Sequence, residues 1–93
     1  MEGLKAENRE LSIKIVAICK SLGDDDVKLM DFVLWLNLAP RWPTLEPPTA
    51  INVLRSMYHL GMWKFHPQQM SALSDLLRDI GRHDLAEKIE QHD

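Results

Sequence analysis

The chain has 93 residues, enough for one small domain with its own core, and we expect a single domain over residues 1–93 with its core in about residues 9–92. Acidic residues outnumber basic ones by 14 to 11, so the chain lacks the positive excess with which nucleic-acid-binding domains neutralise phosphates. A single cysteine excludes an intramolecular disulfide, and an apolar run such as Phe32–Leu36 is far too short to cross a membrane.

The first predicted helix ends near Gly23 and buries one narrow stripe. Four apolar residues recur there at helical spacing: Leu11, Ile15, Ile18 and Leu22. Cys19 lies one position beyond this stripe, and we interpret it as a small hydrophobic residue rather than a nucleophile. The stretch Met1–Glu7 lacks the apolar core of a signal peptide, so we expect a cytoplasmic protein.

The second predicted helix runs from about Val27 to Leu38, with Asp24–Asp26 capping its start and Pro40 beyond its end. Its apolar residues lie on two nearly opposite faces: Val27, Met30, Leu34 and Leu38 on one, and Leu29, Phe32 and Leu36 on the other. Two interpretations remain open. Either the helix is packed between neighbours on both sides, or the face with Phe32 is exposed as a docking patch.

Prolines dominate the segment after this helix. Four of the five prolines of the chain lie between Ala39 and Pro48, which predicts an irregular segment with at most one helical turn around Thr44–Glu46. Trp42 lies within this segment, and we expect its large side chain to cover the core.

Cap residues and apolar spacing predict three further helices: one from Thr49 to Gly61, one from Pro67 to Gly81, and a short one from Leu85 to about Gln91. Their inner stripes are Ala50, Val53, Leu54 and Met57 in the first, and Met70, Leu73, Leu77 and Ile80 in the second. Because the connections are short, successive helices are expected to pack on one another in a compact all-α bundle.

No residue pattern in the sequence indicates catalysis or metal binding. The four histidines and Cys19 lack the spacing of metal ligands, and Asp24–Asp26 lacks the alternating ligands and the glycine of a calcium loop. A glycine-rich phosphate loop is also missing. We therefore expect no enzyme activity, no cofactor and no metal.

One short motif, Gly81-Arg82-His83-Asp84-Leu85, is only partly explained by helix capping. Gly81 is expected to end one helix in a left-handed conformation, and Asp84 to cap the next helix together with Glu87. Arg82 has no role in this arrangement. Its guanidinium can form paired hydrogen bonds with carboxylates, including one from a neighbouring helix.

The segment Leu76–Leu85 resembles the closing signature of death effector domains, in which R-x-D-L lies at the junction of the last two helices. An acidic residue opening the second helix, an aromatic residue within its apolar run, and Leu60-Gly61-Met62 are similar to the family as well. The resemblance covers about residues 9–92. It implies a compact antiparallel six-helix bundle, the death fold, whose third helix is here short or irregular because of the prolines.

The resemblance also implies that the chain binds other domains of its own kind through two surface features. One is a charge triad of Asp26, Arg82 and Asp84, with Asp24 and Asp25 as alternatives to Asp26; the other is a hydrophobic patch of Phe32 and Leu36. The implied partners are other death effector domains in homo- or hetero-oligomers, with no nucleic acid and no membrane. The implied role is that of an adaptor or initiator-caspase prodomain that assembles signalling complexes in apoptosis or innate immunity.

Two alternatives remain open. The chain could belong to another death-fold subfamily, although R-x-D-L argues against pyrin and caspase-recruitment domains. It could instead be a helical regulatory domain that binds an amphipathic peptide in a groove, with Met57, Met62 and Met70 as adaptable contacts.

Overall fold

The computed structural model describes residues 6–90 and is all-helical over this range, as the sequence predicts. Its elements are α1 (Ala6–Ser21), α2 (Asp24–Leu38), α3 (Ala50–His59), the 3₁₀ turn η1 (Pro67–Gln69), α4 (Ser71–Asp79) and α5 (His83–Glu90). The described residues thus contain five α-helices and no strand, and the six-helix arrangement is not confirmed. The predicted end of the last helix at Gln91 lies outside the described residues.

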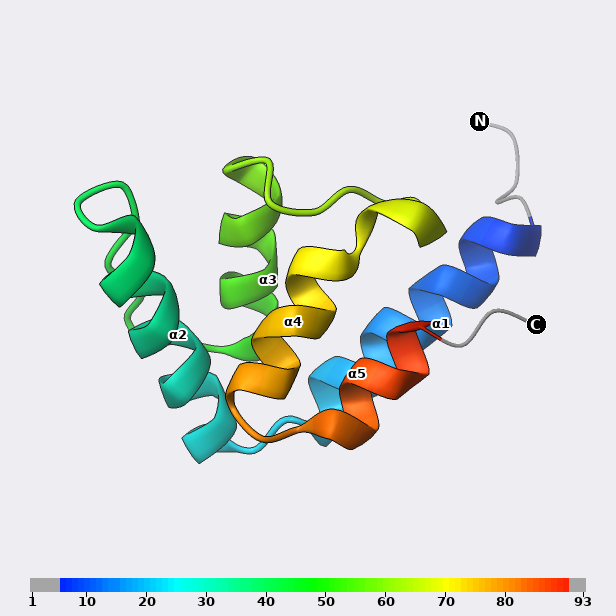
Figure 1. Ribbon diagram of the computed structural model, residues 1–93, viewed down its shortest axis with the longest axis horizontal. Coiled ribbons are helices and arrows are strands. Elements are labelled where there is room, and N and C mark those ends of the chain that lie inside the picture. The colour runs from blue at the N-terminus through cyan, green and yellow to red at the C-terminus, as the bar shows by residue number, and fades with distance from the viewer. Residues whose placement is uncertain (1–5, 91–93) are drawn as a thin grey trace.

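The helices are arranged so that α2 lies at one edge of the molecule. Figure 1 shows α2 at the left, α4 in the centre, and α1 and α5 on the other side. α2 packs on α3 and α4, while α5 packs on both α4 and α1. Because α2 has neighbours on one side only, its outer face is left uncovered, and the interpretation of a helix packed on both sides is wrong.

The predicted inner stripes form the core. Three residues of α2 are buried in it: Val27, Met30 and Leu34. α3 contributes Val53, Leu54 and Met57. α4 contributes Leu73 and Leu77, and Met70, which directly precedes α4, is buried with them. α1 contributes Leu11 and Ile18, whereas Ile15 and Leu22 of the same stripe are only half-buried. α1 therefore leaves part of its apolar stripe without a covering element.

The segment between α2 and α3 is irregular, as its prolines predict, and Thr44–Glu46 forms no helical turn. Trp42 is buried there against the core, and its indole N–H donates a hydrogen bond to Asp31 Oδ1 of α2 at 2.8 Å. This hydrogen bond attaches the segment to α2. The prediction that Trp42 covers the core is confirmed.

Gly81 sets the direction of the chain after α4. It takes the left-handed conformation, with φ of 87°, that glycine adopts without strain. The N–H groups of Gly81 and Arg82 donate to the carbonyls of Arg78 and Leu77 at 3.0 and 2.8 Å, the Schellman pattern that ends a helix. α5 then begins at His83, so Asp84 lies in its first turn and the prediction that it is the N-cap is wrong.

None of the helices in residues 6–90 is long and apolar enough to cross a membrane.

Candidate interaction surfaces

The structure brings Asp26, Arg82 and Asp84 together, and we call these three residues the ion cluster. Arg82 Nη1 lies 2.6 Å from Asp26 Oδ2, and Arg82 Nε and Nη2 donate to the two carboxylate oxygens of Asp84, both at 3.1 Å. Arg82 Nη1 also donates to the backbone carbonyl of Ser21 at 3.1 Å. One side chain therefore connects the end of α1 with the starts of α2 and α5.

The members of the ion cluster differ in how far they reach solvent. The side chains of Arg82 and Asp26 are only 26% and 21% exposed, whereas that of Asp84 is 61% exposed. The expectation of a substantially exposed charge triad is thus met by Asp84, whereas Arg82 and Asp26 depart from it because they are only partly exposed. Hydrogen bonds from Arg82 lower the pKa of Asp84, and those to Asp84 and Asp26 raise the pKa of Arg82.

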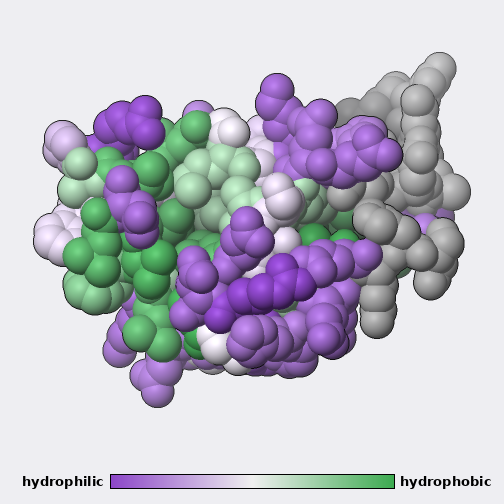
Figure 2. All heavy atoms as spheres, in the orientation of Figure 1, coloured by the Kyte–Doolittle hydropathy of each residue, from purple (hydrophilic) through white to green (hydrophobic). Residues whose placement is uncertain are grey.

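The outer face of α2 carries the second predicted feature. Four large apolar side chains are exposed there: Leu29 (47%), Phe32 (53%), Trp35 (52%) and Leu36 (59%). We call these four residues the α2 ridge. Figure 2 shows hydrophobic residues gathered on the α2 side of the molecule, while hydrophilic residues cover α4 and α5. Four neighbouring exposed hydrophobic side chains on one helix are typical of a protein-binding surface.

Trp35 belongs to the ridge although the sequence analysis does not single it out. It follows Phe32 by three positions, a spacing that places both side chains on the same helix face. Their rings stack, with centroids 6.1 Å apart and an angle of 18° between the planes. The i, i+3 spacing of Phe32 and Trp35 is the feature of the sequence that could have assigned Trp35 to this face.

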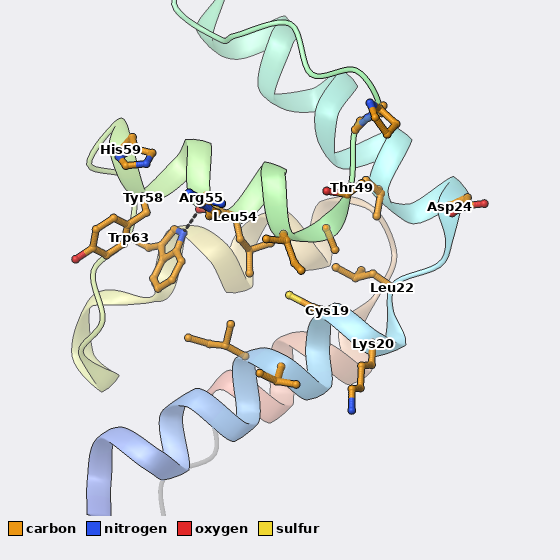
Figure 3. A pocket seen from close by; sticks show the side chains of 17 residues that line it. Cys19, Lys20, Leu22, Asp24, Thr49, Leu54, Arg55, Tyr58, His59 and Trp63 are labelled. Atoms are coloured by element: carbon orange, nitrogen blue, oxygen red, sulfur yellow. Dashed lines mark hydrogen bonds between the residues drawn. The ribbon is translucent and has the colours of Figure 1, made fainter. Parts of the chain in front are cut away.

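A groove of about 910 Å³ between α1 and α3 is a third surface feature, one that the sequence did not reveal. Its lining is mainly apolar and includes Ile15, Val16, Cys19, Leu22, Pro47, Pro48, Ile51, Leu54, Tyr58 and Trp63. Figure 3 shows the Cys19 sulfur and Leu22 pointing into the groove from the α1 side, with the Trp63 indole opposite them. Val16, Ile51 and Tyr58 are exposed at its edges, which makes it accessible to a partner.

The acidic, basic and histidine side chains of the groove lie at its rim, where all of them are exposed: Lys20, Asp24, Arg55 and His59. Cys19 lies deeper, where burial raises the pKa of its thiol and keeps that side chain uncharged. The interior therefore favours apolar side chains, and the rim has a small excess of positive charge.

The methionines that were expected to line a peptide groove lie elsewhere. Met57 and Met70 are buried in the core and are not available to a partner, while Met62 is partly buried against it. The alternative of a methionine-lined groove is therefore wrong in its residues.

Within residues 6–90, no group of three or more His, Cys, Asp or Glu side chains could hold a metal ion. Comparison of the chain with protein-family models, with curated proteins and with solved structures finds no match. The function must therefore be inferred from the three surface features themselves.

Proposed function

We propose that this chain is a homotypic interaction domain of the death effector type, which assembles by inserting the α2 ridge of one copy into the α1–α3 groove of the next. Such a domain would act in the cytoplasm as part of an adaptor or an initiator-caspase prodomain in apoptosis or innate immunity. Binding, rather than catalysis, is its activity. The R-x-D-L segment and the ion cluster are the features that support the family assignment.

The observation that carries the proposal is that one chain exposes an apolar ridge and an apolar groove on different helices. Each is open in the folded chain, so neither covers the other. A convex surface on one copy and a concave surface on another fit a heterologous, head-to-tail contact, which leaves a free ridge and a free groove at the ends. Assembly can then continue beyond a dimer.

Charge supports the same pairing. The ridge helix starts with Asp24, Asp25 and Asp26 and carries Asp31 further on, with Lys28 as its one basic residue. The groove rim carries two basic residues, Lys20 and Arg55, against one carboxylate, Asp24. Because the rim has a small positive excess, docking of an acidic helix against it is more favourable than docking of an uncharged helix.

The ion cluster has a supporting role in this proposal. Asp26 precedes Leu29 of the ridge by three positions, so the cluster lies beside the first turn of the docking face. By connecting the ends of α1, α2 and α5, Arg82 fixes the orientation of α2, and the exposed Asp84 carboxylate remains available to a partner.

A pair of complementary variants tests the head-to-tail contact. Phe32→Glu places a charge on the ridge, and Ile51→Glu places one at the groove; both residues are exposed, so the fold should tolerate either change. The wild type should grow in size with concentration by light scattering, and each variant alone should stay monomeric. An equal mixture should give a one-to-one complex, since one intact ridge and one intact groove remain.

Two results would contradict the proposal. A wild type that stays monomeric at all accessible concentrations would argue against homotypic assembly. If the wild type assembles but the mixed variants form no complex, the ridge and the groove do not bind one another.

A further inference from the structure

Trp35 differs from the other two tryptophans of the chain in its surroundings. Trp42 and Trp63 are buried, and their indole N–H groups donate to Asp31 Oδ1 at 2.8 Å and to the Leu54 carbonyl at 3.0 Å. Trp35 is 52% exposed, and none of the described residues accepts a hydrogen bond from its indole. Its N–H is therefore left to solvent in the isolated chain.

The stacking of Trp35 on Phe32 makes the two rings a preformed unit. Both side chains project from successive turns of α2, and the near-parallel rings restrict each other's rotamers. A side chain that is already ordered loses less conformational entropy when a partner covers it. Aromatic residues held in this way often provide most of the binding energy of an interface.

A surface that covers Trp35 must satisfy two conditions at once. It must be apolar enough to receive two rings, and it must offer an acceptor, because burying the indole N–H without one is unfavourable. The α1–α3 groove of a second copy meets both conditions. Its interior is apolar, and its lining includes the Asp24 carboxylate at the rim and the Thr49 hydroxyl, whose oxygen accepts the Asn52 N–H at 3.1 Å and has a second lone pair for another donor.

We propose that Trp35 is the specificity-determining residue of the ridge, and that its indole N–H selects a groove containing a hydrogen-bond acceptor, as the groove of a second copy does. This inference rests on the proposed function. The indole N–H distinguishes Trp35 from Leu36, which is similarly exposed but can contribute only apolar area to a contact.

The experiment measures self-association of Trp35→Ala, Trp35→Phe and Leu36→Ala by sedimentation. Ile13→Ala is the matched control, since Ile13 is an exposed apolar residue of α1 outside the groove lining. We expect Trp35→Ala to weaken association by about tenfold or more, and Trp35→Phe, which keeps a ring but lacks the donor, by roughly threefold to fivefold. Leu36→Ala should have a smaller effect than Trp35→Ala, and Ile13→Ala almost none.

Tryptophan fluorescence provides a second readout. Trp42 and Trp63 are buried before assembly, but Trp63 lines the groove and can respond to docking as well, so Trp35→Phe identifies the part of the blue shift that comes from Trp35. The wild type should show the larger shift and Trp35→Phe a clearly smaller one, even at concentrations at which that variant still assembles. Circular dichroism melts should be nearly the same for all variants, since none of these side chains belongs to the core.

The outcomes separate this inference from the proposed function. If Phe32→Glu prevents assembly while Trp35→Ala has no effect, the ridge binds without Trp35 and the inference is wrong. If Trp35→Phe assembles like the wild type, the selection through the indole N–H is wrong. If neither Phe32→Glu nor Trp35→Ala alters association, the proposed function itself is wrong.

Discussion

Arg82 connects three separate parts of the described chain. Its guanidinium bonds Asp26, Asp84 and the Ser21 carbonyl, which belong to three different helices or their ends. Most of its N–H groups are therefore occupied within the fold, which suits a positioning role better than direct contact with a partner. The Schellman turn at Gly81 determines where Arg82 leaves α4, so the glycine and the arginine act together.

Arg82→Ala should lower the free energy of unfolding by about 1 kcal/mol, because the ion pairs are partly exposed and exposed pairs contribute little. In this variant the Asp26 carboxylate would still accept the hydrogen bond from the Gly23 N–H, which is 3.1 Å long in the wild type, and water would hydrate the oxygen that Arg82 leaves. Urea unfolding followed by circular dichroism measures the change. Arg82→Lys is the control, since it keeps the charge but loses the paired geometry and should recover only part of the loss. A loss above about 3 kcal/mol would instead indicate a buried and essential cluster.

Asp84 should make the stability of the domain dependent on pH in the acidic range. Hydrogen bonds from Arg82 lower its pKa in the folded chain below the ordinary value of 3.8, so the folded state binds this proton less readily than the unfolded state does. The contribution of Asp84 is therefore fully present above about pH 4 and is lost as the pH falls through the lowered pKa. The same sign holds for Glu90, whose pKa is lowered by its hydrogen bond from Arg78.

The measurement is the midpoint of thermal unfolding between pH 2 and pH 7. Asp84→Asn should reduce the slope below pH 4, since the variant has no carboxylate to protonate. Glu46→Gln, which changes an exposed carboxylate in the irregular segment, is the control and should keep the slope of the wild type. An unchanged slope in Asp84→Asn would show that Arg82 does not stabilise the charged form of Asp84.

At the scale of the single element, α2 has two apolar faces with different roles. The hydrophobic spacing of the sequence separates these faces correctly, because side chains four and seven positions apart must share a side of any α-helix. Spacing does not reveal which face is covered, since that depends on where α3 and α4 lie. The structure answers this by placing α2 at an edge, with Met30 inward and Phe32 outward.

Met30→Ala and Phe32→Ala should therefore have opposite consequences. Met30 is fully buried, so its truncation leaves a cavity and should destabilise the fold by about 2–5 kcal/mol. Phe32→Ala removes an exposed ring and should leave the melting temperature almost unchanged while weakening self-association. One melting curve and one sedimentation run on each variant decide the matter. If Phe32→Ala unfolds the domain and Met30→Ala does not, α2 is rotated the other way.

At the scale of the whole molecule, the features that the sequence did not predict are those formed by distant segments. The groove needs α1, α3 and Pro47–Pro48 to meet, and no local pattern in any of them indicates a cavity. The sequence indicates that Arg82 binds carboxylates. It does not indicate how far Asp26 is covered, because that depends on how three helix ends pack together. The all-α class and the irregular proline segment were predictable, because backbone preferences alone determine them.

The charge distribution of the whole molecule leads to the last prediction, which concerns salt. The chain has a net charge of −3, so two copies repel one another at long range, while the acidic α2 and the basic groove rim attract at contact. The molecule measures 37 × 30 × 21 Å, whereas the screening length at 0.1 M salt is about 10 Å. Repulsion between whole molecules is therefore already largely screened at 0.1 M salt. Further salt can weaken only the local attraction between α2 and the groove rim.

Raising NaCl from about 0.1 to 0.5 M should thus weaken self-association by a few-fold without abolishing it, because the apolar contact of ridge and groove is insensitive to screening. Arg55→Gln should bind more weakly at 0.1 M and lose much of the salt dependence, since the rim charge it removes is the one that salt screens. Lys64→Gln changes an exposed basic residue outside the groove lining and should leave the salt dependence unaltered. Sedimentation at the two salt concentrations tests this. If Arg55→Gln and the wild type respond to salt identically, the rim charge takes no part in docking and the contact is held by its apolar residues alone.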